Sequence, residues 1–163
     1  MKFRPVIQGS FSTADAARLA GLTPRQLDHW DHLGFLSPSL TRARGYGSAR
    51  RYSFSDVVRL KVAGRLRASG VSLARLRRCA AVLRRLDGAG EADLSRARLI
   101  VSRDRVLWVR SDREVIDLVR EGQMLLVFAL GEAVAETAGA VRRLGRERQR
   151  FPDPKPASRA LGR

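Results

Sequence analysis

The sequence is poor in the residues that disulfides and metal sites require. It contains a single cysteine, Cys79, which excludes an internal disulfide, and it has 2 histidines, which leaves little for a structural zinc site. No apolar run approaches the roughly 18 residues of a membrane-spanning helix. Residues 1–5 lack the apolar core of a secretion signal. We therefore expect an intracellular protein of the cytoplasm with no membrane partner.

The patterns that mark common catalytic centres are also missing. The sequence has no glycine-rich phosphate loop and no nucleophile elbow, and both histidines, His29 and His32, lie in one short segment. Asp28 and Asp31 stand beside them, but nothing nearby supplies a third soft ligand for a metal. The sequence predicts no enzyme, no metal site and no cofactor.

Basic charge is abundant and unevenly spread. The chain holds 32 Lys and Arg against 16 Asp and Glu, a formal net charge of +16. Residues 1–87 carry 17 basic and 5 acidic side chains, whereas residues 88–163 carry 15 and 11. The change coincides with the glycine-containing linker at 87–91. We expect a basic domain at 1–87, a second domain at 91–145, and a disordered basic tail at 146–163.

Helix signals in the first domain predict a helix-turn-helix. Ser12 and Asp15 form a capping-box pattern for a helix that Gly21 ends. Thr23 followed by Pro24 marks the start of a second helix, to about residue 33. Two short helices joined by a turn of three to four residues containing glycine are typical of this motif. Trp30 on its apolar stripe is expected to be a core anchor.

After this motif, the sequence predicts an exposed hairpin and two more helices. Glycines and arginines alternate around two tyrosines between residues 42 and 52. A helix is expected from Ser53 to Gly70 and another from Ser72 to about residue 86, with Cys79 on its apolar side.

Beyond the linker the hydrophobic period changes to that of strands. Residues 98–102 and 106–109 predict a hairpin, residues 111–121 a helix, 124–130 a buried strand and 132–144 a last helix. The expected fold is a mainly α winged helix-turn-helix domain followed by a small α/β domain of hairpin, helix, strand and helix.

Short motifs in the first domain follow one another in a recognisable order. They are Phe11-Ser12, the helix ending in Gly21-Leu22, the run Arg25 to Asp31, Gly34-Phe35-Leu36-Ser37-Pro38, Gly45-Tyr46, Arg50-Arg51-Tyr52, and Leu66 to Leu73 around Gly70. In this order, over about residues 10–86, they resemble the DNA-binding domain of the MerR family of bacterial transcription regulators. The resemblance implies a winged helix-turn-helix fold that binds duplex DNA.

The match has departures. Asp28 stands where the family commonly has an arginine, and the wing has extra residues between Arg44 and Ala49. The long helix that pairs full-length members and the cysteine cluster of metal-sensing members are missing. The two-fold dimer and promoter-twisting activation of the family are therefore not carried over.

We expect DNA contacts from three places. The start of the second helix would face the major groove, where arginine suits guanine and glutamine suits adenine (Thr23, Pro24, Arg25, Gln26, His29). The wing would contact phosphates or the minor groove through arginines, with tyrosines as donors to the DNA backbone (Arg42, Arg44, Arg50, Arg51, Tyr46, Tyr52). The first helix would add phosphate contacts (Ser12, Thr13, Arg18).

These observations predict a sequence-specific regulator of transcription that binds double-stranded DNA, located at the nucleoid. The second domain is expected to form a homo-oligomer, or to contact RNA polymerase or another protein partner. A ligand-sensing pocket is the alternative role for this domain. Two alternatives use the same DNA contacts: an antitoxin-like autorepressor and an excisionase-like architectural protein. A ribosome- or RNA-associated basic protein would explain the charge, but not the ordered helix-turn-helix and wing.

Overall fold

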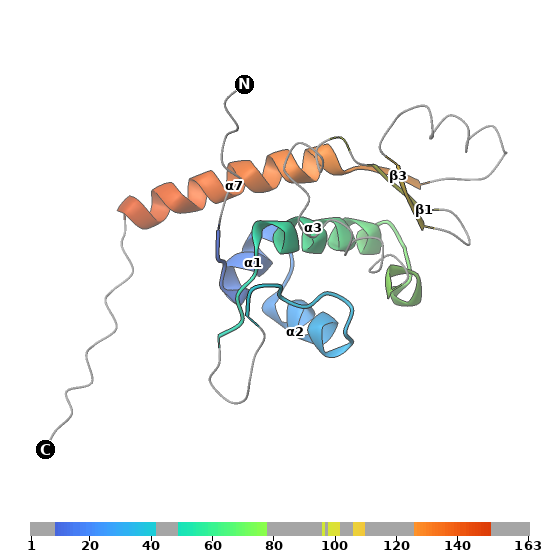
Figure 1. The fold of residues 1–163 in the computed structure, drawn as a ribbon, viewed down its shortest axis with the longest axis horizontal. Coiled ribbons are helices and arrows are strands. Elements are labelled where there is room, and N and C mark those ends of the chain that lie inside the picture. Colours follow the sequence, from blue (N-terminus) through green and yellow to red (C-terminus); the bar gives the residue numbers. More distant parts are fainter. Residues whose placement is uncertain are drawn as a thin grey trace, which may run out of the picture.

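The computed structural model describes residues 9–41, 49–77, 96, 98–101, 106–109 and 126–150. These residues are mostly helical and begin with the predicted helix-turn-helix (Figure 1). The predicted linker, the predicted helix at 111–121, the predicted helix at 72–86 beyond residue 77, and residues 151–163 of the predicted tail lie outside the described residues. So do wing residues 42–48.

The first two helices begin and end where their capping residues predict. Helix α1 spans Thr13–Ala20; the Ser12 hydroxyl accepts a hydrogen bond from the amide of Asp15, and Gly21 ends the helix with a left-handed φ of 72°. Helix α2 spans Pro24–His32 and follows the cap residue Thr23. The turn between them is therefore held by local hydrogen bonds at both of its ends.

Helix α3 spans Phe54–Ala68 and carries a buried carboxylate near its start. Asp56 is 2% exposed, and its carboxylate accepts hydrogen bonds from the amides of Ser53 and Ser39, both at 2.8 Å. It also pairs with the buried guanidinium of Arg59. This carboxylate ties the start of α3 to the loop that follows α2.

Two isolated antiparallel bridges enclose the wing. Phe11 pairs with Tyr52, and Thr41 pairs with Arg51 through hydrogen bonds of 3.0 and 3.2 Å. The second bridge brings residues 41 and 51 together, so it closes the base of the segment predicted as a wing. Its tip, with Arg42, Arg44 and Tyr46, falls in residues 42–48.

The second half contributes a small sheet. Strand β1 (Arg98–Val101) lies between β2 (Val106–Val109) and β3 (Leu126–Ala129), antiparallel to both. Strands β1 and β2 lie within the segments predicted as a hairpin, 98–102 and 106–109. The strand predicted at 124–130 is observed over Leu126–Ala129, and Leu130 already belongs to the next helix. The sheet leads directly into the last helix.

Helix α7 spans Leu130–Arg150 and is longer than the predicted 132–144. The prediction that the tail begins at 146 is wrong for residues 146–150, which are helical. A glycine inside a helix costs only about 1 kcal/mol, so Gly145 does not end it. The last turns instead contact α1, where Arg148 pairs with Asp15, a side chain that is 13% exposed, at 2.6 Å.

One hydrophobic core joins the two halves of the chain. Leu27 and Trp30 of α2, Leu60 of α3, Leu99 of β1 and Val134 of α7 belong to a single buried cluster. Figure 1 shows α7 running along α3, with α1 and α3 between α7 and α2. The apolar face of α7 is therefore buried within the same chain, against the helix-turn-helix domain.

Candidate nucleic-acid interface

The first turn of α2 lies at the surface. Thr23, Pro24, Arg25 and Gln26 are all exposed, and so is His29 one turn later. Leu27 and Trp30 are buried on the other side of the helix, where Trp30 packs edge-on against Phe35 with ring centroids 5.3 Å apart. The predicted role of Trp30 as a core anchor is confirmed, and α2 offers one polar face to a partner.

A capping box determines which groups of this turn remain available. The amide of Gln26 donates to the Thr23 hydroxyl at 3.2 Å, and the Gln26 side-chain oxygen accepts from the amide of Thr23 at 2.8 Å. Gln26 thus uses its only acceptor to hold the start of the helix, which leaves its amide nitrogen as a donor. A two-bond contact with adenine would require the box to open. Among the described residues, no ion pair or hydrogen bond engages Arg25.

Arg50 is not a free wing cation. Its guanidinium contacts Asp28 at 2.7 Å through Nη1 and Asp31 at 3.0 Å through Nε, and its side chain is 18% exposed. The hydrogen bond from Arg50 lowers the pKa of Asp28, and the same bond raises the pKa of Arg50. The arginine therefore contacts both carboxylates of α2, offsets one of their two charges, and fixes the base of the wing to this helix.

This contact explains the acidic residue where the family commonly has arginine. The sequence identified Asp28 only as a departure from the family pattern and did not assign Asp31 a role. The available signal was the pair of carboxylates three residues apart, which place two charges on one side of a helix. Its partner lies twenty-two residues away, beyond the wing, so no local pattern identifies it.

The two residues after Arg50 face opposite ways. The Arg51 side chain is exposed, whereas Tyr52 is 1% exposed and packs in the core. Burial raises the pKa of the Tyr52 phenol. The prediction that Tyr52 donates to the DNA backbone therefore does not fit its position, because its ring points inward to support the bridge with Phe11.

The candidates on α1 differ in their availability. Ser12 uses its hydroxyl in the helix cap, where it contacts the Asp15 carboxylate at 2.7 Å. Thr13 is partly buried. Arg18 pairs with Glu147 of α7 at 3.3 Å, and the two side chains are 58% and 60% exposed. An ion pair in so much solvent contributes little, so Arg18 remains accessible to a stronger anion.

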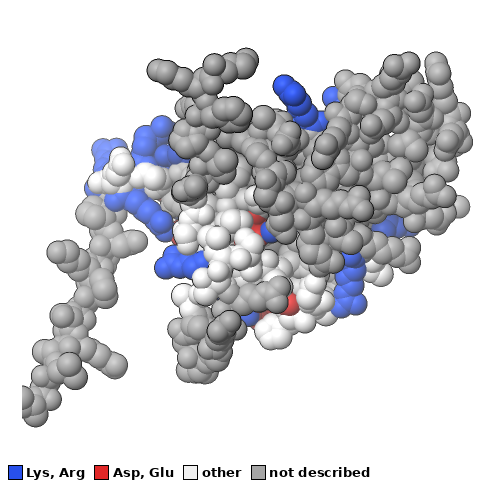
Figure 2. Space-filling view, viewed as in Figure 1, with Lys and Arg blue, Asp and Glu red and all other residues white. Residues whose placement is uncertain are grey.

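Figure 2 shows Lys and Arg side chains at several places on this face of the described surface, with few Asp or Glu between them.

Two further properties of the described residues concern metal binding and membrane spans. They contain no group of three His, Cys, Asp or Glu side chains that could hold a metal ion. No described helix combines the length and apolar character that crossing a membrane requires.

The segment that holds the helix-turn-helix and the wing base also matches a known family. Residues 11–82 match the model of the MerR HTH family regulatory protein. Residues 11–82 therefore form a MerR-type helix-turn-helix domain. This agrees with the resemblance seen in the sequence.

Mycobacterial relatives match more of the chain than this domain. Proteins of Mycobacterium bovis (strain ATCC BAA-935 / AF2122/97) and Mycobacterium tuberculosis (strains CDC 1551 / Oshkosh and ATCC 25618 / H37Rv) are named uncharacterized HTH-type transcriptional regulators. Each is 36% identical to this chain over 126 residues, which is 77% of this chain and 55% of the relative. The chain thus spans about half the length of these curated relatives.

Proposed function

We propose that this chain is a transcription regulator that binds a specific sequence of double-stranded DNA. In this proposal, the first turn of α2 enters the major groove and Arg25 contacts a base, since its guanidinium matches the acceptors of guanine. The observation that carries the proposal is the exposed, capped start of α2 with Arg25 free of described partners, inside a MerR-type domain.

Arg51 is proposed to contact the DNA backbone, in contrast to the base contact of Arg25. It lies exposed at the base of the wing, next to the bridge with Thr41, so it suits a phosphate beside the groove that α2 occupies. Arg42, Arg44 and Tyr46 of the wing are proposed as further contacts, and Arg18 as a phosphate contact on α1. Arg50 holds α2 and the wing together and is proposed to position them instead of touching DNA.

The test is fluorescence anisotropy of the full chain with duplex DNA from upstream of its own gene, in a salt series, beside a scrambled duplex and a matched RNA. We expect preference for the first duplex by about a thousandfold near physiological salt. Arg25→Ala is expected to reduce this preference by about 1–3 kcal/mol, whereas Arg51→Ala weakens all duplexes alike and lowers the salt slope by about one.

Arg142→Ala is the matched control, because it removes the same charge from an exposed position on α7. If both Arg25→Ala and Arg51→Ala bind as the control does, the proposed use of α2 and the wing is wrong. Equal and steeply salt-dependent binding to both duplexes and the RNA would instead indicate a non-specific binder of nucleic acid.

Pairing of two copies and location at the nucleoid remain part of the proposal. The inner face of α7 is covered by α3, so pairing would have to use other surfaces. Sedimentation of the full chain, alone and with the duplex, measures the number of copies. A single copy on DNA would remove oligomerisation from the proposal and leave the DNA contacts of α2 to be judged separately.

A further inference from the structure

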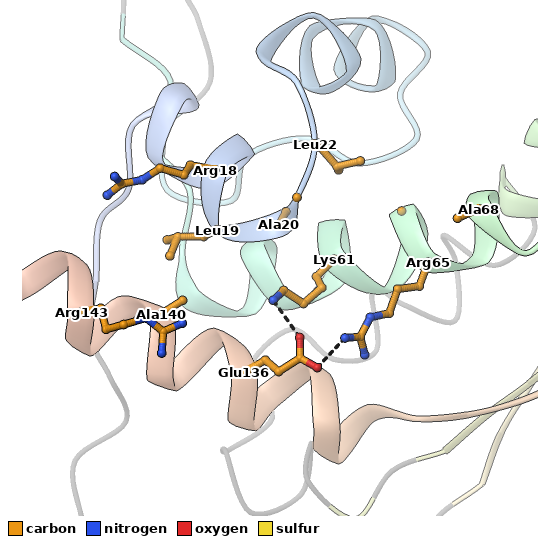
Figure 3. A pocket seen from close by; sticks show the side chains of 12 residues that line it. Arg18, Leu19, Ala20, Leu22, Lys61, Arg65, Ala68, Glu136, Ala140 and Arg143 are labelled. Carbon is orange, nitrogen blue, oxygen red and sulfur yellow. Dashed lines mark hydrogen bonds and ion pairs between the residues drawn. The ribbon is translucent and has the colours of Figure 1, made fainter.

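A cleft of about 480 Å³ opens where α7 crosses α1 and α3 (Figure 3). Its lining comes from the end of α1, the α1–α2 turn and the facing sides of α3 and α7. The volume falls within the range of small-molecule sites, about 300–1,000 Å³. No DNA contact proposed above, apart from that of Arg18 at its rim, involves this part of the molecule.

The charge of the lining is strongly unbalanced. Four basic side chains, Arg18, Lys61, Arg65 and Arg143, share the cleft with one carboxylate, Glu136. Lys61 and Arg65 donate to the two oxygens of Glu136 at 3.2 and 2.6 Å. The hydrogen bonds from Arg65 and Lys61 lower the pKa of Glu136, so the carboxylate stays ionised and still leaves an excess of positive charge. A concave surface of one sign focuses its field on an opposite charge.

Arg143 is the most available of these cations. Among the described residues, no carboxylate pairs with it, and it lies on α7 beyond Ala140 (Figure 3). Arg18 pairs with Glu147, which does not line the cleft. A ligand with an anionic head could therefore gain charge-assisted hydrogen bonds without first breaking the Glu136 contacts.

The remaining lining is small and apolar. Leu19 and Leu22 form one wall and Ala140 faces them from α7. At Gly64 of α3, a Cβ atom would approach Leu22 Cδ2 to 3.1 Å, so the absence of a side chain there lets Leu22 pack closely against α3. Lys61 lies deep, with a side chain 13% exposed. Such depth suits a small molecule with an apolar body and not the backbone of DNA lying on the surface.

We propose that this cleft binds a small organic anion, with a phosphate or carboxylate head and an apolar body. Basic side chains of α3 and α7 would neutralise the head, and the leucines would cover the body. Because Gly21 and Leu22 line the cleft, the ligand would contact the turn that orients α2. The binding itself does not depend on the proposed function, so the two can fail separately.

The test is isothermal titration calorimetry of the full chain with phenyl phosphate and with benzoate, which present the two heads on the same apolar body. Inorganic phosphate and phenol each lack one half of the ligand. We expect saturable binding of one or both aromatic anions, and weaker binding of the two partial probes. Arg143→Ala should weaken binding by about tenfold or more. Arg142→Ala, the neighbour outside the cleft, should leave the affinity unchanged.

Glu136→Gln is expected to change the affinity for the anion in the opposite direction. It removes the competing carboxylate while keeping its shape, so we expect tighter binding of the anion, a result that misfolding cannot produce. Equal losses in Arg142→Ala and Arg143→Ala would overturn the proposal by showing general attraction to a basic surface. Absence of saturable binding to both aromatic anions would overturn it as well. So would a loss of duplex binding in Arg143→Ala that matches its loss of anion binding, because the cation would then serve DNA.

Discussion

The contact of Arg50 with two carboxylates of α2 makes a sharp prediction for stability. Arg50 and Asp31 are 18% and 16% exposed, so solvent screens their interaction only partly. The contact of Arg50 Nε with Asp31 is an ion pair, and a partly screened pair contributes about 1 kcal/mol, which corresponds to about 2–4 °C of melting temperature for a chain of this size. We expect Arg50→Ala to lower the melting temperature by that amount, measured by circular dichroism.

Arg51→Ala is the natural control, because it removes the same charge one residue later from an exposed side chain. Its effect on stability should stay within about 0.5 kcal/mol. If the two variants melt at the same temperature, the contact of Arg50 with the carboxylates does not stabilise the fold, and the prediction is refuted. DNA binding gives a second discriminator: Arg50→Ala should leave the salt slope unchanged, whereas loss of the phosphate contact of Arg51 should lower it by about one.

The contact between Arg50 and Asp28 also makes the stability of the fold depend on pH. Because the folded pKa of Asp28 is lowered from its ordinary 3.8, its stabilising contribution is present above that value and is lost as pH falls through the folded pKa. The difference in melting temperature between Arg50→Ala and the parent should therefore be full at neutral pH and should shrink in acid. A difference that is the same at pH 7 and at the acid end would exclude the carboxylates as its source.

Two further predictions concern the core. Asp56→Ala removes the buried carboxylate that pairs with Arg59 and accepts from the amides of Ser39 and Ser53, so it should cost about 3–5 kcal/mol, measured by urea denaturation, while Ser55→Ala beside it changes little. An equal midpoint for both variants would contradict this. Removal of 91–163 should leave a domain that melts far below the full chain, because α7 residues such as Leu130 and Val134 each contribute about 1.5–3 kcal/mol of burial. Removal of 151–163 is its control, and equal melting of the two truncations would show that the halves are independent.

Much of the helix-turn-helix could be predicted because its signals are local. The cap residues Ser12, Thr23 and Ser53 each begin a helix, and glycines with positive φ follow the ends, as at Gly21 and Gly34. These residues act through hydrogen bonds to atoms three or four positions away, so spacing alone reveals them. The strands of the sheet were predictable for the same reason, from short apolar runs.

The packing of the second half could not be predicted in this way. Periodicity shows that one side of α7 is apolar, but it does not show what covers that side. The sequence therefore favoured a second domain that pairs with another copy, whereas the structure covers Val134 and Ala138 with the first domain. The extension of α7 past Gly145 depends on Arg148 and Asp15, which are 133 residues apart.

Contacts between distant residues also separate the predicted DNA-binding residues from one another, although the sequence alone provided no order among them. Arg25 and Arg51 are exposed, Arg18 has an exposed partner that a phosphate can replace, and Arg50 is held by two carboxylates. Each phosphate contact steepens the dependence of log K on log salt by about 0.9, so an arginine held inside the protein adds nothing to the slope. The proposed role of Arg50 is to position α2. Because it pairs with Asp28 and Asp31, the two carboxylates of α2 face the base of the wing. The capped first turn is then the part of the helix that can approach a polyanion.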